Sequence, residues 1–82
     1  KVFGRVEQSL MQEKFLAAVR QLLSERETTV MIMRYALEGG APMPQREVAR
    51  RLKISRSYVS RIEKRALEKL RDGLNREDFL AD

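Results

Sequence analysis

The 82-residue chain contains no cysteine and no histidine. It can therefore form neither disulfides nor thiolate metal sites, and it lacks the commonest metal ligand and general base. Long apolar runs are also missing, because none approaches the roughly 20 residues that span a bilayer, and nothing resembles a signal peptide. These absences favour a cytoplasmic protein with no cofactor, no metal, no small-molecule substrate and no membrane partner.

The length of the chain indicates one small domain, which buries about 60% of its unfolded surface and leaves little room for a large catalytic cleft. Its carboxylates are scattered along the chain without a convergent cluster. The sequence therefore argues against an enzyme such as a nuclease or recombinase fragment.

Positive charge is concentrated in one part of the chain. The formal net charge is +5, and Lys/Arg balance Asp/Glu six to five over residues 1–44, ten to three over residues 45–71 and one to four over residues 72–82. A basic run can be an ordinary solvated helix face, but this one coincides with a predicted pair of helices. The coincidence favours a polyanionic partner.

Apolar spacing predicts two helices in the first half of the chain. The first is expected from about Ser9, and Ser24 and Glu27 form a capping box that begins a second helix reaching about Leu37. Gly39-Gly40 is expected to end this second helix. The apolar face of the first helix comprises Leu10, Phe15, Leu16, Val19, Leu22 and Leu23.

A helix-turn-helix is predicted in the basic region. Its first helix spans residues 45–52, its turn is Lys53-Ile54-Ser55 with Ser55 as N-cap, and its second helix runs from Arg56 to about Arg71. The expected fold class is thus all-α, a small four-helix domain ending in a helix-turn-helix, winged-helix-like in type. The positions that crossed helices need to be small or apolar are filled by Ala49, Ile54, Val59 and Ile62, and the apolar face continues through Ala66 and Leu70.

The second helix of such a unit enters the major groove of DNA, whose width of about 12 Å accommodates a helix with its side chains. Tyr58 lies to one side of this helix, where it either covers the edge of the core or contacts a phosphate or base. The side chains expected to reach base edges are Arg56, Ser57, Ser60 and Arg61.

The segment QREVARRLKISRSYVSRIEKRALEKL, residues 45–70, resembles region 4.2 of the sigma-70 family of bacterial RNA polymerase sigma factors. Its part SRSYVSRIEKRALEKL is especially similar to the sporulation sigma-K and sigma-E group, and the preceding LLSERETTVMIMRYALEGG is similar to region 4.1. Two adjacent motifs in the right order are more specific than a lone helix-turn-helix. The resemblance covers residues 15–71, roughly 70% of the chain.

The resemblance implies a division of the chain into three parts. Residues 1–10 would be the end of a linker, and residues 11–72 a sigma region 4 domain, with region 4.1 at about 15–40 and region 4.2 at about 44–71. Residues 73–82 would form an acidic tail, which is disordered, forms a short helix or folds back on the basic face.

The resemblance also implies a function in transcription initiation. Such a domain binds the promoter −35 element as double-stranded DNA and docks on the flap of the β subunit of RNA polymerase through the apolar surface of its first two helices. An anti-sigma factor or an activator would be a further partner. The protein would then act in the bacterial cytosol, associated with the nucleoid.

Individual roles follow from the alignment with the family. Arg56 matches a base-reading arginine suited to guanine O6 and N7, and Ser57 and Arg61 match further base-contact positions. Contacts with the DNA backbone are expected from Arg34, Gln45, Arg46, Lys53, Ser55, Tyr58 and Lys64. Positions that face an activator in some sigma factors are Arg65 and Arg71.

Besides Tyr58, three of the backbone assignments have a second interpretation. Lys53 occupies a turn position where many helix-turn-helix units have glycine, so it is either strained or contacts phosphate. The alternative for Lys64 is an exposed pair with Glu68, and the alternative for Arg34 is an ion pair within region 4.1.

The sequence also departs from the family pattern. Housekeeping sigma factors carry an acidic residue at the position of Ser57 and an amide at that of Arg61, so the housekeeping −35 sequence is not the expected target. Pro44 replaces the usual threonine cap, which should displace or weaken the start of the third helix. Ala36 replaces the family's glycine at a tight backbone approach.

A stand-alone helix-turn-helix regulator is the alternative function. It would need a dimer interface and half-sites about one helical turn apart. No obvious dimerisation helix follows residue 72, which favours the sigma-type domain.

Overall fold

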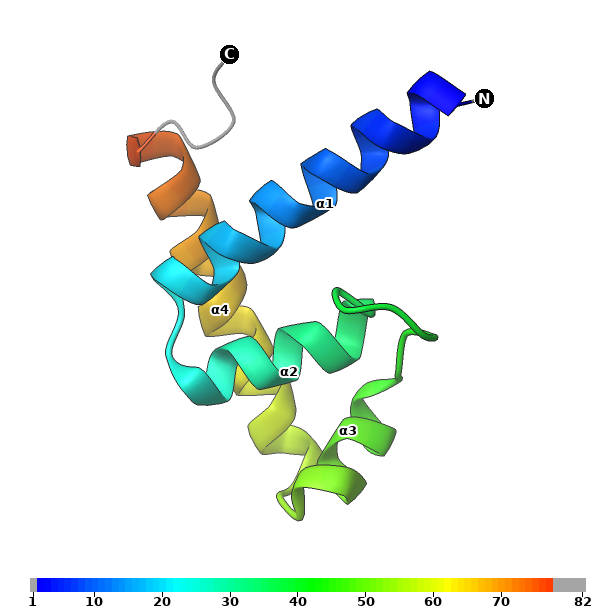
Figure 1. The fold of residues 1–82 in the computed structure, drawn as a ribbon. Helices are drawn as coiled ribbons and strands as arrows, with labels where there is room; N and C mark the ends of the chain where they lie inside the picture. Colours follow the sequence, from blue (N-terminus) through cyan, green and yellow to red (C-terminus); the bar gives the residue numbers. More distant parts are fainter. Residues whose placement is uncertain (1, 78–82) are drawn as a thin grey trace.

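The computed structural model describes residues 2–77, and all regular structure in this range is helical (Figure 1). Four helices follow one another: α1 (Val2–Leu22), α2 (Glu25–Tyr35), α3 (Gln45–Leu52) and α4 (Arg56–Glu77). The long α4 packs against the other three, with α1 across its C-terminal half, α3 against its N-terminal half and α2 across its middle. The expected all-α fold ending in a helix-turn-helix is confirmed.

The helix α1 begins at Val2, so the expected start near Ser9 was wrong. It includes Gly4, which destabilises a helix by only about 1 kcal/mol and does not prevent continuation of the hydrogen-bonded ladder. Its first half projects beyond the other helices (Figure 1), and Leu10, expected on the buried face, is 55% exposed. The second half of α1 contributes Ala18 and Val19 to the core.

The capping box at the start of α2 is confirmed. The Ser24 side chain accepts a hydrogen bond from the Glu27 amide at 3.2 Å, and the Glu27 carboxylate accepts one from the Ser24 amide at 3.0 Å. The two bonds satisfy amide groups that a helix N-terminus otherwise leaves unpaired. They fix the entry of the chain into α2 immediately after α1.

The C-terminal end of α2 differs from expectation. The helix ends at Tyr35, because Ala36 adopts a left-handed conformation with φ 53° and the Leu37 amide donates to the Ile32 carbonyl at 3.1 Å. This bonding pattern is a Schellman-type helix end, which normally has glycine at the left-handed position. The expected stop at Gly39-Gly40 was therefore wrong; these glycines, both with positive φ, shape the connection to α3.

We expect Ala36→Gly to stabilise the domain. A side chain in the left-handed region costs about 1–2 kcal/mol, whereas the extra backbone entropy of glycine in the unfolded chain offsets roughly half of this gain, leaving about 0.5–1 kcal/mol. Urea unfolding followed by far-UV circular dichroism measures the change. Ala41→Gly is the matched control, because Ala41 is exposed and has no positive φ, and it should be neutral or destabilising. A loss of stability in Ala36→Gly would contradict the strain.

The core consists of two adjoining clusters along α4. The first joins α1, α2 and the C-terminal half of α4, and the second joins α2, α3 and the N-terminal half of α4. The predicted apolar face of α4 is confirmed, since Val59, Ile62, Ala66 and Leu70 are all at most 7% exposed. The first cluster contains Val19, Leu23, Met31, Ala66 and Leu70; the second contains Val30, Val48, Ala49, Val59 and Ile62.

The helix α4 continues to Glu77, beyond its expected end at Arg71, so the first part of the acidic tail is helical. Gly73 is buried there, and a Cβ atom on it would lie 2.7 Å from the Leu22 side chain. The absence of a side chain at this position permits the close crossing of α1 and α4. The alternatives for residues 78–82 lie outside the described part of the chain.

The turn of the helix-turn-helix has the predicted residues and geometry. Lys53 ends α3 in the left-handed region with φ 59°, so the strain expected for a non-glycine residue is present. Ile54 packs on the second cluster, and Ser55 accepts a hydrogen bond from the Tyr58 amide at 3.0 Å as the N-cap of α4. At the other end of α3, Pro44 provides no side-chain cap, yet the helix still begins at Gln45.

Candidate nucleic-acid interface

The first two turns of α4 carry polar side chains on the side away from the core. Val59 and Ile62 anchor this part of the helix, which leaves the intervening positions facing solvent. One hollow beside the helix is lined by Gln45 together with all four residues expected to contact bases: Arg56, Ser57, Ser60 and Arg61. The structure therefore brings these four side chains to one surface.

A second hollow lies between the end of α2 and the beginnings of α3 and α4. It is lined by Pro44, Gln45 and three arginines, Arg34, Arg46 and Arg56. Because Pro44 supplies no capping oxygen, the first amides of α3 have no side-chain acceptor, and the helix dipole adds partial positive charge there. Positive charge and amide donors at one place suit an anion such as a phosphate.

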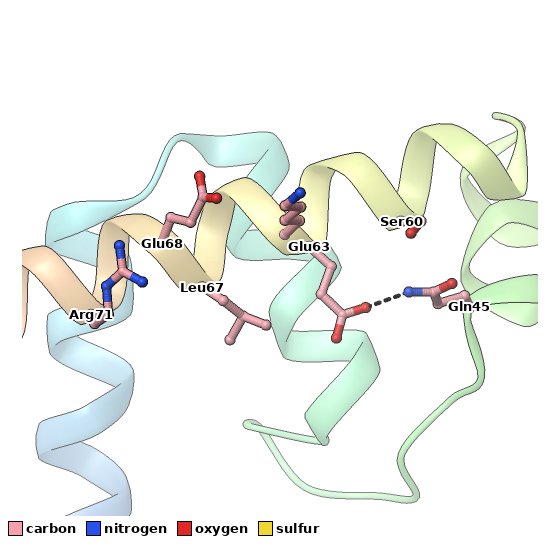
Figure 2. Close-up of a pocket in the computed structure, with 7 residues that line it drawn as sticks. Gln45, Ser60, Glu63, Leu67, Glu68 and Arg71 are labelled. Atoms are coloured by element: carbon pink, nitrogen blue, oxygen red, sulfur yellow. Dashed lines mark hydrogen bonds between the residues drawn. The ribbon is translucent and has the colours of Figure 1, made fainter.

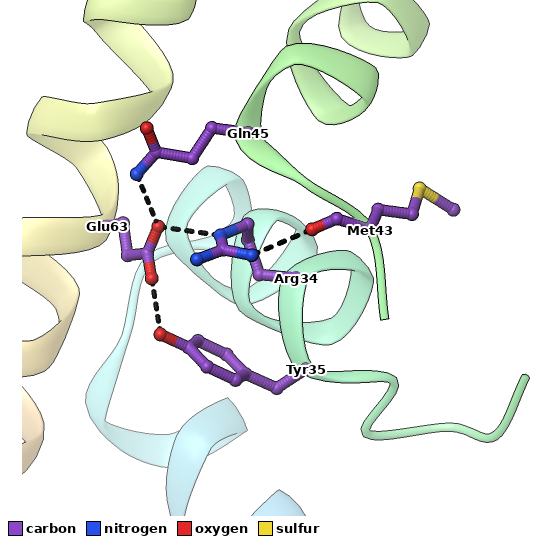
Figure 3. Close-up of polar contacts among 5 residues, drawn as sticks. All are labelled: Arg34, Tyr35, Met43, Gln45 and Glu63. Atoms are coloured by element: carbon purple, nitrogen blue, oxygen red, sulfur yellow. Dashed lines mark hydrogen bonds and ion pairs between the residues drawn. The ribbon is translucent and has the colours of Figure 1, made fainter. Parts of the chain in front are cut away.

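A buried carboxylate lies behind this surface, and the sequence analysis did not identify it. Glu63 is 5% exposed, and its Oε1 accepts hydrogen bonds from Arg34 Nε and Gln45 Nε2, both at 2.8 Å (Figure 3). Its Oε2 accepts from the Tyr35 hydroxyl, and Arg34 Nη1 also donates to the Met43 carbonyl at 2.8 Å. One acidic side chain thus connects α4 with α2, α3 and the segment between them.

The electrostatics of this cluster keep Glu63 ionised. Burial raises the pKa of Glu63, but the hydrogen bonds from Arg34, Tyr35 and Gln45 together outweigh burial, so its net pKa lies below the usual value. The same contacts with Glu63 raise the pKa values of Arg34 and Tyr35. Arg34 therefore forms an ion pair, as its alternative interpretation expected, although its partner Glu63 lies on α4 and not within residues 15–40.

The other residues expected to contact DNA lie on exposed parts of the helix-turn-helix. Lys53, Ser55 and Lys64 are exposed, and Tyr58 is 42% exposed, with the guanidinium of Arg61 over its ring at 5.8 Å from the centroid. Contacts of this kind contribute little at exposed sites, but they favour one orientation of the arginine.

Two exposed arginines on α3 have an acidic neighbour. Glu47 pairs with both Arg50 and Arg51, which lowers the pKa of Glu47 to about 2. The carboxylate therefore stays charged and partly neutralises this side of α3. The positive surface is correspondingly centred on Arg46 and the start of α4.

The residues expected to face an activator lie farther along α4. Arg65 is near Glu27, with 3.9 Å between Arg65 Nε and Glu27 Oε2, and Arg71 pairs with its neighbour Asp72. Burial raises the pKa of Glu27, but the hydrogen bond from the Ser24 amide and the Lys69 ammonium outweigh it, and the net pKa is lowered. Both arginine side chains remain about 70% exposed and accessible.

An apolar groove lies on another side of the domain, between α1 and the end of α2. It is lined by Met11, Gln12, Phe15, Tyr35, Ala36 and Leu37. Met11 and Tyr35 are 55% and 42% exposed, while Phe15 and Leu37 pack against the first core cluster. Exposed large apolar side chains at a concave surface are typical of protein-binding sites.

The described residues lack two further features. No group of three or more Asp, Glu, His or Cys side chains within residues 2–77 is placed to hold a metal ion. Over the same range, none of the helices has the length and hydropathy needed to cross a membrane.

The fold and the exposed basic face of α4 define a helix-turn-helix DNA-binding domain. Residues 19–72 match the family described as Sigma-70, region 4, and the chain belongs to this family. The resemblance inferred from the two sequence motifs is thereby confirmed.

Curated relatives are named RNA polymerase sigma factors. The RNA polymerase sigma-E factor of Clostridium acetobutylicum is 37% identical over 92% of this chain and 32% of the relative. The RNA polymerase sigma-28 factor of Bacillus thuringiensis subsp. kurstaki is 45% identical over 84% of this chain and 29% of the relative. The RNA polymerase sigma-K factor of Bacillus subtilis is 53% identical over 60% of this chain and 17% of the relative.

The chain thus spans no more than about a third of the length of these relatives. No solved structure gives a significant match.

Proposed function

We propose that this domain recognises the promoter −35 element and docks on the β flap of RNA polymerase, as region 4 of an alternative, sporulation-type sigma factor that directs transcription initiation. The observation that carries the proposal is the joint exposure of Arg56, Ser57, Ser60 and Arg61 at the start of α4, in a chain of the sigma-70 region 4 family. The sequence similarity to sigma-E and sigma-K factors supports the sporulation-type assignment.

In the proposed complex, the N-terminal half of α4 lies in the major groove. Arg56 is at the first turn, where a guanidinium can donate two hydrogen bonds to O6 and N7 of one guanine. Ser57, Ser60 and Arg61 contact neighbouring base edges. Because Ser57 and Arg61 differ from the housekeeping residues, we propose a −35 sequence different from the housekeeping one.

Backbone contacts are assigned to the basic surroundings of this helix. Arg34, Arg46 and the first amides of α3 bind one phosphate, while Lys53 and Lys64 reach others on either side of the groove. Neutralising about five phosphates would give the logarithm of affinity a slope of roughly −4 to −5 against the logarithm of salt concentration. A single small module binds weakly, so tethering to polymerase would supply the effective concentration.

We expect Lys64→Glu to weaken DNA binding equally on all sequences. Lys64 is exposed on α4 and contacts a phosphate in the proposed complex. With glutamate in its place, this phosphate is no longer neutralised, one counterion fewer is released on binding, and the new negative charge repels the DNA. The slope against salt should become shallower by about 1. Fluorescence anisotropy at several salt concentrations, with a duplex that contains the preferred −35 sequence (the matched duplex) and with a scrambled one, measures the affinity and its slope against salt. A selective loss on the matched duplex would instead assign Lys64 to base reading.

The apolar groove between α1 and α2 is assigned to the β flap. The exposed Met11 and Tyr35 would contact apolar side chains of the flap, and Phe15 and Leu37 form the floor. This surface lies outside the set of residues assigned to DNA, so one domain can bind both partners together. An activator or anti-sigma factor would use the exposed arginines farther along α4, Arg65 and Arg71. The complex would form in the bacterial cytosol at the nucleoid.

A pull-down of the 82-residue chain with the isolated β flap tests the proposal. Binding of the unmodified chain and its loss in Met11→Asp are expected, because the substitution places a charge in the apolar groove. Gln21→Asp is the matched control, since Gln21 is exposed on the same helix and does not line the groove. No binding by the unmodified chain would favour a stand-alone regulator.

A further inference from the structure

Glu63 is buried behind the basic face of α4, and its environment differs from that of the exposed side chains on this face. A carboxylate is acceptor-only, and burying it is unfavourable unless donors surround it. Here three donors meet its two oxygens, and no buried side-chain polar atom within the described residues lacks a partner. The arrangement is therefore complete without any additional ligand.

The donors connect this carboxylate to the proposed DNA-binding surface. Gln45 lines three neighbouring hollows. One contains the candidate base-contact residues of α4, and a second contains the three clustered arginines. The third is shown in Figure 2 and is lined by Ser60 and Lys64 among others. Its side-chain amide also donates to Glu63 Oε1. Gln45 is thus shared by the buried cluster and the exposed surface.

The acceptor-only nature of Glu63 determines how Gln45 is oriented. Its NH2 group must face the carboxylate, because its carbonyl oxygen would be repelled there. One of its two N–H groups is used in this bond, so the other N–H and the oxygen remain for a partner outside the cluster. Arg34 is held in the same way, with Nε on Glu63 and Nη1 on the Met43 carbonyl.

We infer that Glu63 is a positioning residue for sequence recognition, which presets the Gln45 amide and the Arg34 guanidinium at the junction of α3 and α4 before DNA binds. This inference rests on the proposed function and names a determinant of specificity that does not itself touch DNA. Orientation before binding lowers the conformational entropy lost on association. Contacts with the DNA backbone fix the register of the reading helix on the duplex. A loosened Gln45 would therefore let the base-contact residues of α4 meet the bases less exactly, so discrimination falls more than overall binding.

The test compares discrimination with stability. The unmodified 82-residue chain first selects a duplex from a randomised pool, and discrimination is the ratio of its affinities for the selected duplex and a scrambled one. Glu63→Met keeps a long helix-forming side chain but removes the acceptor, and should lower this ratio about fivefold or more. Glu63→Gln should restore much of it, because its oxygen can still accept from Gln45 and its NH2 can donate to the Tyr35 oxygen.

Glu27→Met is the matched control. Glu27 is also a buried acid with a cationic partner, but it contacts Ser24 and Lys69 and lines none of the three hollows that contain Gln45. Its loss should lower the urea midpoint and leave the discrimination ratio unchanged. Gln45→Met should lower the ratio in the unmodified chain and have little further effect in Glu63→Met, because the two residues act as a unit.

Several outcomes would overturn the inference. The first is a discrimination ratio in folded Glu63→Met that is within twofold of that of the unmodified chain. The second is a loss of discrimination in Glu27→Met as large as that in Glu63→Met. The third is that the effects of Glu63→Met and Gln45→Met on discrimination are fully additive. If Glu63→Met does not fold, hydrogen exchange of the Gln45 side-chain amide in the unmodified chain decides: exchange as fast as in the exposed Gln12 and Gln21 refutes preorganisation. If the unmodified chain selects no duplex, the same hydrogen-exchange measurement tests the inference, and the proposed function is contradicted if the chain also fails to bind the β flap.

Discussion

Arg56→Ala is expected to lower affinity for the selected duplex about tenfold to a hundredfold while leaving flap binding unchanged. A bidentate arginine–guanine pair contributes about 1–3 kcal/mol of discrimination, and Arg56 is exposed at the first turn of α4 with no ion pair found for it among the described residues. Affinity for a scrambled duplex should fall less, because only the charge contribution is lost there. Anisotropy titrations with both duplexes give the two values.

Arg26→Ala is the matched control for the loss of charge. Arg26 is exposed in the first turn of α2 and lines neither hollow beside α3. Its removal should lower affinity for both duplexes slightly and equally. Equal losses of selected-duplex binding and flap binding in Arg56→Ala would show a general structural defect and contradict base reading by Arg56.

The elements that could be predicted from the sequence depend on short-range rules. The capping box of Ser24 and Glu27 needs only residues three apart, and the apolar face of α4 from Val59 to Leu70 follows from helical periodicity. The exposed face of α4 follows from the same periodicity. Helical periodicity therefore predicts that the four candidate base-contact residues share one surface.

The features that were missed depend on contacts between distant segments. Glu63 reads as one more charge on a polar helix, and only the packing of α2 and α3 brings Arg34, Tyr35 and Gln45 to it from 18 to 29 positions away. Its spacing was the available signal, because Glu63 follows buried Val59 by four residues and precedes buried Ala66 by three, which places it at the edge of the apolar face. The early end of α2 at Ala36 was missed because two glycines nearby gave a stronger local signal.

The two-cluster core predicts that stability and the proposed DNA reading can be altered separately. The second cluster fixes α3 against the start of α4 through Val48 and Val59, while the first fixes α1 against the end of α4. The side chains proposed to read DNA lie on the part of α4 that the second cluster supports. A defect in the first cluster should therefore reduce the folded fraction without changing the surface that the folded molecules present.

Met31→Ala is expected to cause the largest loss of stability, about 2–5 kcal/mol, through lost burial and the cavity left behind. Met31 is 2% exposed in the first cluster, between α1 and the C-terminal half of α4. A domain of this size is stable by roughly 4–12 kcal/mol, so the variant would be marginal at 37 °C. Urea unfolding at low temperature measures the change.

Met11→Ala provides the matched comparison, because the same atoms are removed from a side chain that is 55% exposed. It should change the free energy of unfolding by less than about 0.5 kcal/mol and weaken flap binding instead. Met31→Ala, corrected for its folded fraction, should retain the discrimination of the unmodified chain between duplexes. Similar stability losses for the two methionines would contradict the assignment of Met31 to the core and of Met11 to a binding groove.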